Sequence, residues 1–475
     1  MFRVRAFGQL TSALPGPLVG RRGRRVASPI KRLQFQPLTM VALTPMSGVV
    51  RDGPSEILRM DGEARTNGLG MAPLVRALAV WGPGILVMLA DTDAGNVVVA
   101  AQGGALWGYR LLPLVLVLIP MLYLIQELTV RLGVFTGRGH AELIRERYGP
   151  GWALVAIAGL AAAAIGSLVT EFTGVAGVGE MFGLSRSLTV PLAAAALLAI
   201  VGTGSYRRVE RAAIVIGLFE LAFFAVAWAA RPKLAQIAGD AFDLPFGNQA
   251  FLYMVAAIIG ATFNPWMIFY QQSATVDKRL QPCDLAHART DTAIGAALTQ
   301  LLTGAVLIAA AAIFAYDGHK PAELDSVGAI SAALTPALGA AAGKIVFGAG
   351  VIGASMVAAI VASLALAWGV GEIAGYKRSL EFRPFAAGWF YSVYALCVTG
   401  AALAVWASRD LVWLIVAAQV LNAFLMPLVV GFLIALAASA LPEPYRLGGW
   451  RLRIIVGICA AVSALGVIGG LRVLG

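Results

Sequence analysis

The sequence predicts an all-α membrane protein that crosses the bilayer many times. Of its 475 residues 59% are hydrophobic and only 13% are charged, whereas globular domains carry about a quarter charged residues. The mean hydropathy is +0.81, and apolar stretches of roughly 20 residues, each long enough to cross a bilayer as a helix, recur along the chain. Two of these stretches are interrupted by polar residues, glycine or proline at corresponding places.

Residues 1–75 differ from the rest in being basic rather than apolar. Nine arginines and lysines precede the first acidic residue, Asp52. No apolar core of a signal peptide follows them. We expect a disordered basic tail, with a targeting role as the alternative. The net charge of +11 is concentrated here and in loops, so it does not indicate a nucleic-acid partner.

Residues 76–475 form the predicted transmembrane domain of eleven helices. We divide it into a first repeat over 79–230, a second over 250–439 and an extra helix over 452–472. The expected spans are 79–103, 106–131, 152–178, 188–203, 211–230, 250–274, 291–316, 341–370, 387–406, 411–439 and 452–472.

The distribution of positive charge sets the expected orientation. If the N-terminus is cytoplasmic, the cytoplasmic loops of this eleven-helix arrangement and the helix ends beside them hold 16 lysines and arginines, and the external side holds fewer. Such an excess inside is the normal topological signal. We expect a cytoplasmic N-terminus, an external C-terminus and a location in the plasma membrane.

The first and sixth helices are expected to be broken. "DTDAGN" (91–96) interrupts the first, and "GATFNPW" (260–266) interrupts the sixth, where Pro265 removes a backbone donor. Each break opens a five-helix half. Because five is odd, the second half must enter the membrane the other way up. Paired breaks in inverted halves indicate a substrate site near the bilayer midplane.

The residues at these breaks predict a site for a divalent cation, since carboxylate, amide and carbonyl oxygens bind hard ions. We expect Asp93 to be the main ligand and Asn96 to add an amide oxygen. The second break contributes Asn264 and the carbonyl of Ala261. For Asp91 two positions are open: at the entry to the ion site, or in the shell behind the ligands.

Other residues complete the expected membrane interior. Thr262 either offers its hydroxyl to the ion or caps the break. Glu220 is either a neutral hydrogen-bonded acid or a residual proton site. The three histidines fall between the predicted spans, which excludes a histidine-built metal site in the membrane.

The stretch "WGPGILVMLADTDAGN" (81–96) and the following "GALWGYRLLPLVLVLIPMLYLIQELTVRLGVFTGRGHAELIRERYG" (104–149) resemble the Nramp family of divalent-metal transporters. "YRRVE" (206–210) and "AAQVLNAFLMP" (417–427) extend the similarity. The resemblance implies a LeuT-like inverted repeat of five plus five helices. It also implies that Gln419 reaches the ion directly or through water, with a purely structural hydrogen bond as the alternative.

Two departures from the family pattern bear on function. Typical members have Met-Pro-His in the sixth helix, where this chain has Asn264, Pro265 and Trp266. An amide oxygen in place of a thioether favours hard ions, and the pattern resembles the Nramp-related magnesium-transporter branch. A sulfur ligand from Met88 or Met267 is the alternative.

The second departure concerns proton coupling. The family's proton route uses a histidine in helix six and acids in helix three. In helix six, Trp266 and Gln271 occupy this region. In helix three, Leu168 replaces one acid and Glu171 is retained. We expect Glu171 to lie at the entry to the site or in the shell behind the ligands. Without a chain of titratable groups we expect weak or absent proton coupling.

We therefore expect transport of Mg²⁺, with Mn²⁺ also carried, by alternating access. The alternatives are a proton-coupled Mn²⁺/Fe²⁺ importer and an ion-coupled carrier of amino acids or other organic solutes on the same fold. No catalytic motif is present and no enzyme or cofactor is expected. The expected partners are the transported divalent ions and the lipid bilayer; the oligomeric state is open.

Overall fold

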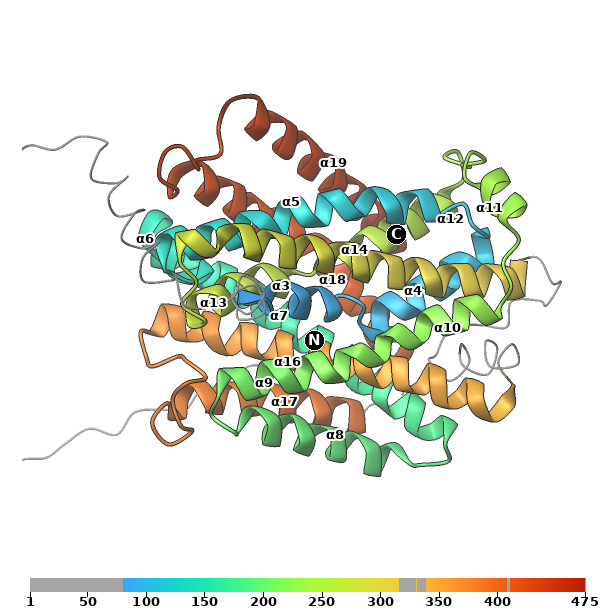
Figure 1. Cartoon of the computed structure of the whole chain (residues 1–475), viewed down its shortest axis with the longest axis horizontal. Coiled ribbons are helices and arrows are strands. Elements are labelled where there is room, and N and C mark those ends of the chain that lie inside the picture. Colours follow the sequence, from blue (N-terminus) through green and yellow to red (C-terminus); the bar gives the residue numbers. More distant parts are fainter. Residues whose placement is uncertain (1–79, 316–329, 331–338, 408–410, 475) are drawn as a thin grey trace, which may run out of the picture. The chain divides into compact units, whose positions relative to one another are not determined.

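The computed structural model describes residues 80–315, 330, 339–407 and 411–474, in which every regular element is helical. A helix covers each of the eleven predicted spans, and the long helices run side by side in Figure 1. By length and hydropathy seven of the described helices are able to cross a membrane, and one bent helix pair raises that number to eight. The predicted basic tail over 1–75 lies outside the described residues.

The first half begins with a broken helix. Its parts are α3 (Pro83–Leu89) and α4 (Ala94–Trp107), which are bent by 52° relative to each other. The other helices of this half and its loops are α5 (Leu112–Thr136), α6 (His140–Tyr148), α7 (Pro150–Met181), α8 (Arg186–Val201), α9 (Tyr206–Gly217), η1 (Leu218–Leu221), α10 (Ala222–Ala229) and α11 (Leu234–Asp240).

The second half begins in the same way, with α12 (Gln249–Thr262) and α13 (Pro265–Asp277) separated by two residues. Both predicted breaks are therefore present. The remaining elements are η2 (Pro282–Asp284), α14 (Leu285–Ala310), the π-helical turn η3 (Ala311–Ala315), α16 (Ala340–Ala374), α17 (Gly388–Ala407), α18 (Leu411–Ser439) and the extra helix α19 (Gly449–Leu474).

Equivalent helices of the two halves pack against each other. The second helix of each half meets its counterpart in the pair α5–α14, the third in α7–α16 and the fourth in α8–α17. A two-fold relation between inverted halves requires such contacts, because equivalent elements near the axis face one another. The broken helix one packs closely on α14, where Gly84 and Gly104 leave no room for a β-carbon.

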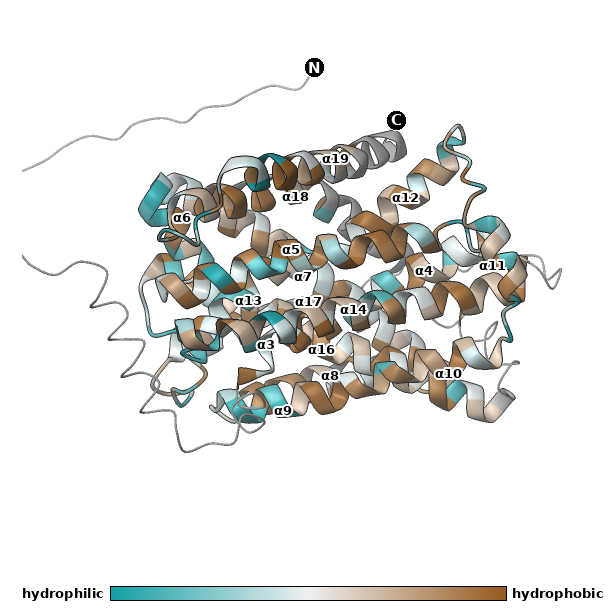
Figure 2. Ribbon diagram, turned by 45° about the horizontal axis from the view of Figure 1, so that its top comes forward, coloured by the Kyte–Doolittle hydropathy of each residue, from teal (hydrophilic) through white to brown (hydrophobic). Residues whose placement is uncertain are grey.

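Apolar side chains cover the outside of the bundle as well as its interior. Leu154 on α7, Leu192 on α8 and Leu396 on α17 are more than 60% exposed, and hydrophobic residues dominate the outer helices in Figure 2. A surface of this kind is suited to lipid rather than water. The chain is a multi-pass integral membrane protein.

Helix five departs from the prediction of one regular helix over 211–230. It contains the 3₁₀ turn η1 between α9 and α10. Here the helix approaches two others closely, since a β-carbon on Gly217 would lie 2.9 Å from the Leu89 side chain of α3 and 3.4 Å from Val357 of α16. The turn buries Glu220 completely.

Candidate functional site

The first break is held open by its own side chains. Asp93 is the N-cap of α4 and accepts a hydrogen bond of 2.7 Å from the backbone nitrogen of Asn96, which satisfies one of the helix's free N–H groups. The amide nitrogen of Asn96 donates to the carbonyl of Asp91 at 2.9 Å. Asp93 and Asn96 thus stabilise the unwound segment locally, at full burial.

The second break is arranged around Asn264. Pro265 begins α13, where its missing N–H costs nothing. The carbonyl of Ala261, freed at the end of α12, accepts from the Asn264 amide nitrogen at 3.1 Å. Thr262 donates its hydroxyl to Ile258 of the same helix at 2.9 Å, so in this structure its proton is used within α12.

The two breaks meet at Asp91 and Asn264. The Asn264 amide nitrogen lies 3.4 Å from Oδ1 of Asp91 while also donating to the Ala261 carbonyl. A partially positive NH₂ group therefore stands between a carboxylate and a carbonyl oxygen. A cation placed there would find the same two oxygens, and rotation of the Asn264 amide would add a third.

Asn422 of α18 extends the network to a third part of the chain. Its amide nitrogen donates to Oδ1 of Asn264 at 2.8 Å, and it is 1% exposed. Asn422 was not predicted from the sequence as a site residue, although it lies in the "AAQVLNAFLMP" stretch one helical turn after Gln419. The side chain of Gln419 lies outside the described residues.

Two oxygens of this network have no hydrogen-bond partner among the described residues, Oδ2 of Asp91 and Oδ1 of Asn422. Asp91 is fully buried, and no ion pair within the described part of the chain includes it. An ionised carboxylate at such depth is costly unless a cation compensates it. The network provides the oxygen ligands that a hard cation uses.

Glu171 of α7 lies behind the first break rather than in this network. Its Oε2 accepts from the backbone nitrogen of Ala94 at 3.2 Å, where the N-terminus of α4 favours negative charge. In the described residues, no three histidine, cysteine, aspartate or glutamate side chains are grouped to hold a metal ion. A metal site at the breaks would therefore need amide and carbonyl oxygens beside its carboxylate.

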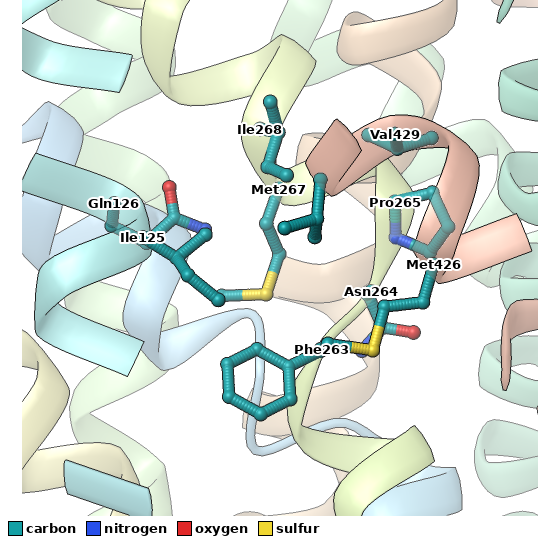
Figure 3. A pocket seen from close by; sticks show the side chains of 10 residues that line it. Ile125, Gln126, Phe263, Asn264, Pro265, Met267, Ile268, Met426 and Val429 are labelled. Carbon is teal, nitrogen blue, oxygen red and sulfur yellow. The ribbon is translucent and has the colours of Figure 1, made fainter. Parts of the chain in front are cut away.

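A small pocket borders Asn264 (Figure 3). It lies between α5, α13 and α18, and its walls are mainly apolar. Gln126, Met267 and Met426 line it together with Asn264. The pocket thus places two thioethers near the amide at the second break, and thioethers are soft ligands.

Comparison with known proteins places this geometry in context. The profile described as "Natural resistance-associated macrophage protein-like" (Nramp) matches residues 84–471. The divalent metal cation transporter MntH of Brucella suis is 32% identical over 308 residues, which are 61% of this chain and 66% of that protein. MntH of Verminephrobacter eiseniae is 25% identical over 422 residues, covering 86% and 90% of the two chains.

Solved structures show the same architecture. The manganese transporter of Eremococcus coleocola, in complex with an aromatic bis-isothiourea compound, has a TM-score of 0.68 at 19% identity, covering 83% of this chain and 86% of its own. A Na⁺-coupled sialic acid symporter has a TM-score of 0.56 at 13% identity, covering 83% and 89%. These similarities establish the fold as the LeuT-like inverted repeat.

Proposed function

Since the chain belongs to the Nramp family of membrane transporters, we propose that it carries divalent metal cations across the bilayer through the site between its two broken helices. The observation that carries the proposal is the buried pair of Asp91 and Asn264, which joins the two breaks. The names of the relatives, divalent metal cation transporters, support the same substrate class.

Within this site the contacts favour Asp91 over Asp93 as the carboxylate that touches the ion. Oδ1 of Asp93 is engaged as the cap of α4, whereas Asp91 faces Asn264 with one oxygen unpartnered. Asn264, Asn422 and the carbonyl of Ala261 supply the neutral oxygens. Asn96 holds the segment in place, and Gln419 would approach from α18.

The donor set favours Mg²⁺, with Mn²⁺ also carried. The polar groups of the network are a carboxylate, side-chain amides and a backbone carbonyl. Mg²⁺ prefers oxygen ligands of this kind and retains several waters. The pocket beside Asn264 supports a second candidate, a Mn²⁺/Fe²⁺ importer, because Met267 and Met426 place thioethers there.

Proton coupling in this proposal is weak or absent. Gln271, in the helix-six region, accepts from Thr129 at 3.1 Å and donates to Thr292 at 2.8 Å. An amide cannot relay protons by titration. The metal would then move down its electrochemical gradient by alternating access, with the N-terminus cytoplasmic.

An organic-solute carrier is the less favoured reading of the same fold. Substrates with a carboxylate bind such sites through unwound backbone amides at a half-helix N-terminus. Here the N-terminus of α4 is occupied by Asp93 and Glu171. Both side chains would repel an anionic substrate.

The selectivity of uptake tests the ligand assignment. We expect liposomes containing the wild-type protein to accumulate Mg²⁺ and Mn²⁺, and Asn264→Met to lower Mg²⁺ uptake relative to Mn²⁺ by at least ~10-fold, since a thioether replaces a hard ligand. Glu180→Gln, an exposed site on α7, is the control. Unchanged selectivity in Asn264→Met would exclude Asn264 as a ligand.

A further inference from the structure

Glu220 is a buried acid that the proposed divalent site does not use. It lies in the 3₁₀ turn η1 of helix five and is 0% exposed. Neither of its carboxylate oxygens has a hydrogen-bond partner among the described residues. A fully buried carboxylate without a close hydrogen-bond partner calls for a ligand.

The unwound first break reaches Glu220 from the other side. Asp91 points toward helix six, but the hydroxyl of the next residue, Thr92, lies near the Glu220 carboxylate without meeting it at normal hydrogen-bond geometry. The same hydroxyl lies 2.8 Å from Oγ1 of Thr299 on α14. Three helices thus bring a carboxylate and two hydroxyls together at the depth of the break.

Further unpartnered oxygen lies one turn along α14. Thr303 is 1% exposed, and its hydroxyl has no hydrogen-bond partner among the described side chains and backbone. It is four residues after Thr299, which places both on one face of the helix. Helix five is fixed against α16 here, because a β-carbon on Gly353 would lie 3.4 Å from the Glu220 backbone nitrogen.

Charge balance around the break indicates the valence of the missing ligand. One divalent ion compensates the two carboxylates of Asp91 and Asp93 and leaves Glu171 and Glu220. Glu171 accepts a hydrogen bond from the N-terminus of α4, whereas Glu220 has no such contact in the described chain. Glu220 belongs to no described group of three or more histidine, cysteine, aspartate or glutamate side chains. A single carboxylate with neutral hydroxyls matches a monovalent ion.

We propose that Glu220, Thr92 and Thr299 form a second cation site that binds Na⁺. The carboxylate neutralises the ion and the hydroxyl oxygens complete its coordination. A protonated Glu220 would use one threonine hydroxyl as its acceptor, whereas Na⁺ would draw on the carboxylate and on both hydroxyl oxygens at once. The Na⁺ site depends on these contacts alone, whereas a Na⁺ dependence of divalent uptake would also rest on the proposed function.

Thermal unfolding of the purified full-length protein tests the site without divalent ions. In EDTA we expect NaCl to raise the Tm with saturation and choline chloride of equal ionic strength to leave it unchanged, since a ligand that binds only the folded state stabilises it. Glu220→Gln should lose the Na⁺ response, and Glu180→Gln on the exposed part of α7 should keep it.

Thr92→Val provides a second variant if Glu220→Gln does not fold. It preserves shape and removes one oxygen, so the half-saturating Na⁺ concentration should rise by about ten-fold. Equal stabilisation by NaCl and choline chloride, or a Na⁺ response unaltered in both variants, would overturn the proposal. The proposal would also be overturned if lowered pH, and not Na⁺, stabilised the protein and Glu220→Gln abolished that effect. Failure of divalent uptake would not affect this measurement.

Discussion

At the first break, Asp91 and Asp93 lie two positions apart and serve different contacts. Asp93, in extended backbone with φ −65° and ψ 170°, turns its carboxylate back to the N-terminus of α4. Asp91 faces Asn264 across the break. The same short segment therefore supplies both the cap that shapes it and the charge that an ion would meet.

The two aspartates should respond differently to loss of charge. Asparagine caps a helix about as well as aspartate, so Asp93→Asn should keep most metal uptake. Asp91→Asn removes the charge that faces Asn264 and should lower uptake by at least ~10-fold. Initial rates of Mn²⁺ entry into liposomes provide the comparison. The reverse order would return the role of main ligand to Asp93.

The sequence predicted Asn264 and the Ala261 carbonyl as ligands because both lie at a break marked by Pro265 and Gly260 in an apolar run, and the structure brings the two groups into contact. It did not predict the direction of each side chain in the unwound segments, since that depends on backbone angles that composition does not determine. Asn422 was missed for a related reason. It lies in an unbroken helix, where a single amide also serves as ordinary interhelical hydrogen bonding.

At the scale of the element, α3 is anchored at its N-terminus by a residue of α14. Asp291 accepts from the backbone nitrogens of Gly82, Gly84 and Ile85 at 3.2, 2.7 and 3.3 Å. Lys278 donates to the carbonyl of Trp81 at 2.6 Å. The short half-helix is thus held at one end and joined to the break at the other.

Loss of that anchor should loosen α3. In Asp291→Asn we expect the amides of residues 83–89 to exchange with deuterium at least ~10-fold faster, because hydrogen bonds to a charged acceptor are weakened. Thr290→Ala, at an exposed neighbour in α14, controls for general destabilisation. Unchanged exchange in Asp291→Asn would show that α3 is held by packing alone.

Helix breaks were predictable where glycine, proline or polar residues interrupted an apolar run, and both are present. The 3₁₀ turn in helix five was not, because Leu218–Leu221 has the composition of an ordinary membrane helix. Its cause is close packing against α3 and α16 at Gly217. Tertiary contacts of this kind leave no signal in the local sequence.

At the scale of the whole molecule, the stability of the fold should depend on pH through His140, in the connection between α5 and α7. Its Nδ1 lies 2.9 Å from Oε1 of Gln272, and its Nε2 is buried with no hydrogen-bond partner in the part of the chain that the structure describes. Burial lowers the pKa of His140 from 6.5 to about 4. The neutral ring is therefore the form that fits the fold.

Because the folded-state pKa is the lower one, this stability is present above pH 6.5 and is lost as the pH falls toward 4. The loss is about 2 kcal/mol at pH 5. The Tm of the wild type in detergent should fall between pH 7.5 and pH 5 by more than that of His140→Gln. Parallel shifts in the two proteins would assign the pH dependence to other groups.

The orientation of the whole chain is open to a direct test with Cys283. This residue is exposed, in the connection between α13 and α14, while Cys397 and Cys459 are buried. With a cytoplasmic N-terminus, that connection is cytoplasmic. A membrane-impermeant maleimide should label Cys283 only after cells are permeabilised, with Cys283→Ser as the control. Labelling of intact cells would invert the topology.

The central claim is that a hard divalent cation binds between the two breaks, on Asp91 and Asn264. The most direct measurement is an anomalous-difference map of the protein crystallised with Mn²⁺. The account predicts a peak at bonding distance from the carboxylate of Asp91, with the Asn264 amide turned to present its oxygen. A peak elsewhere in the bundle, with the Asn264 nitrogen still facing Asp91, would contradict it.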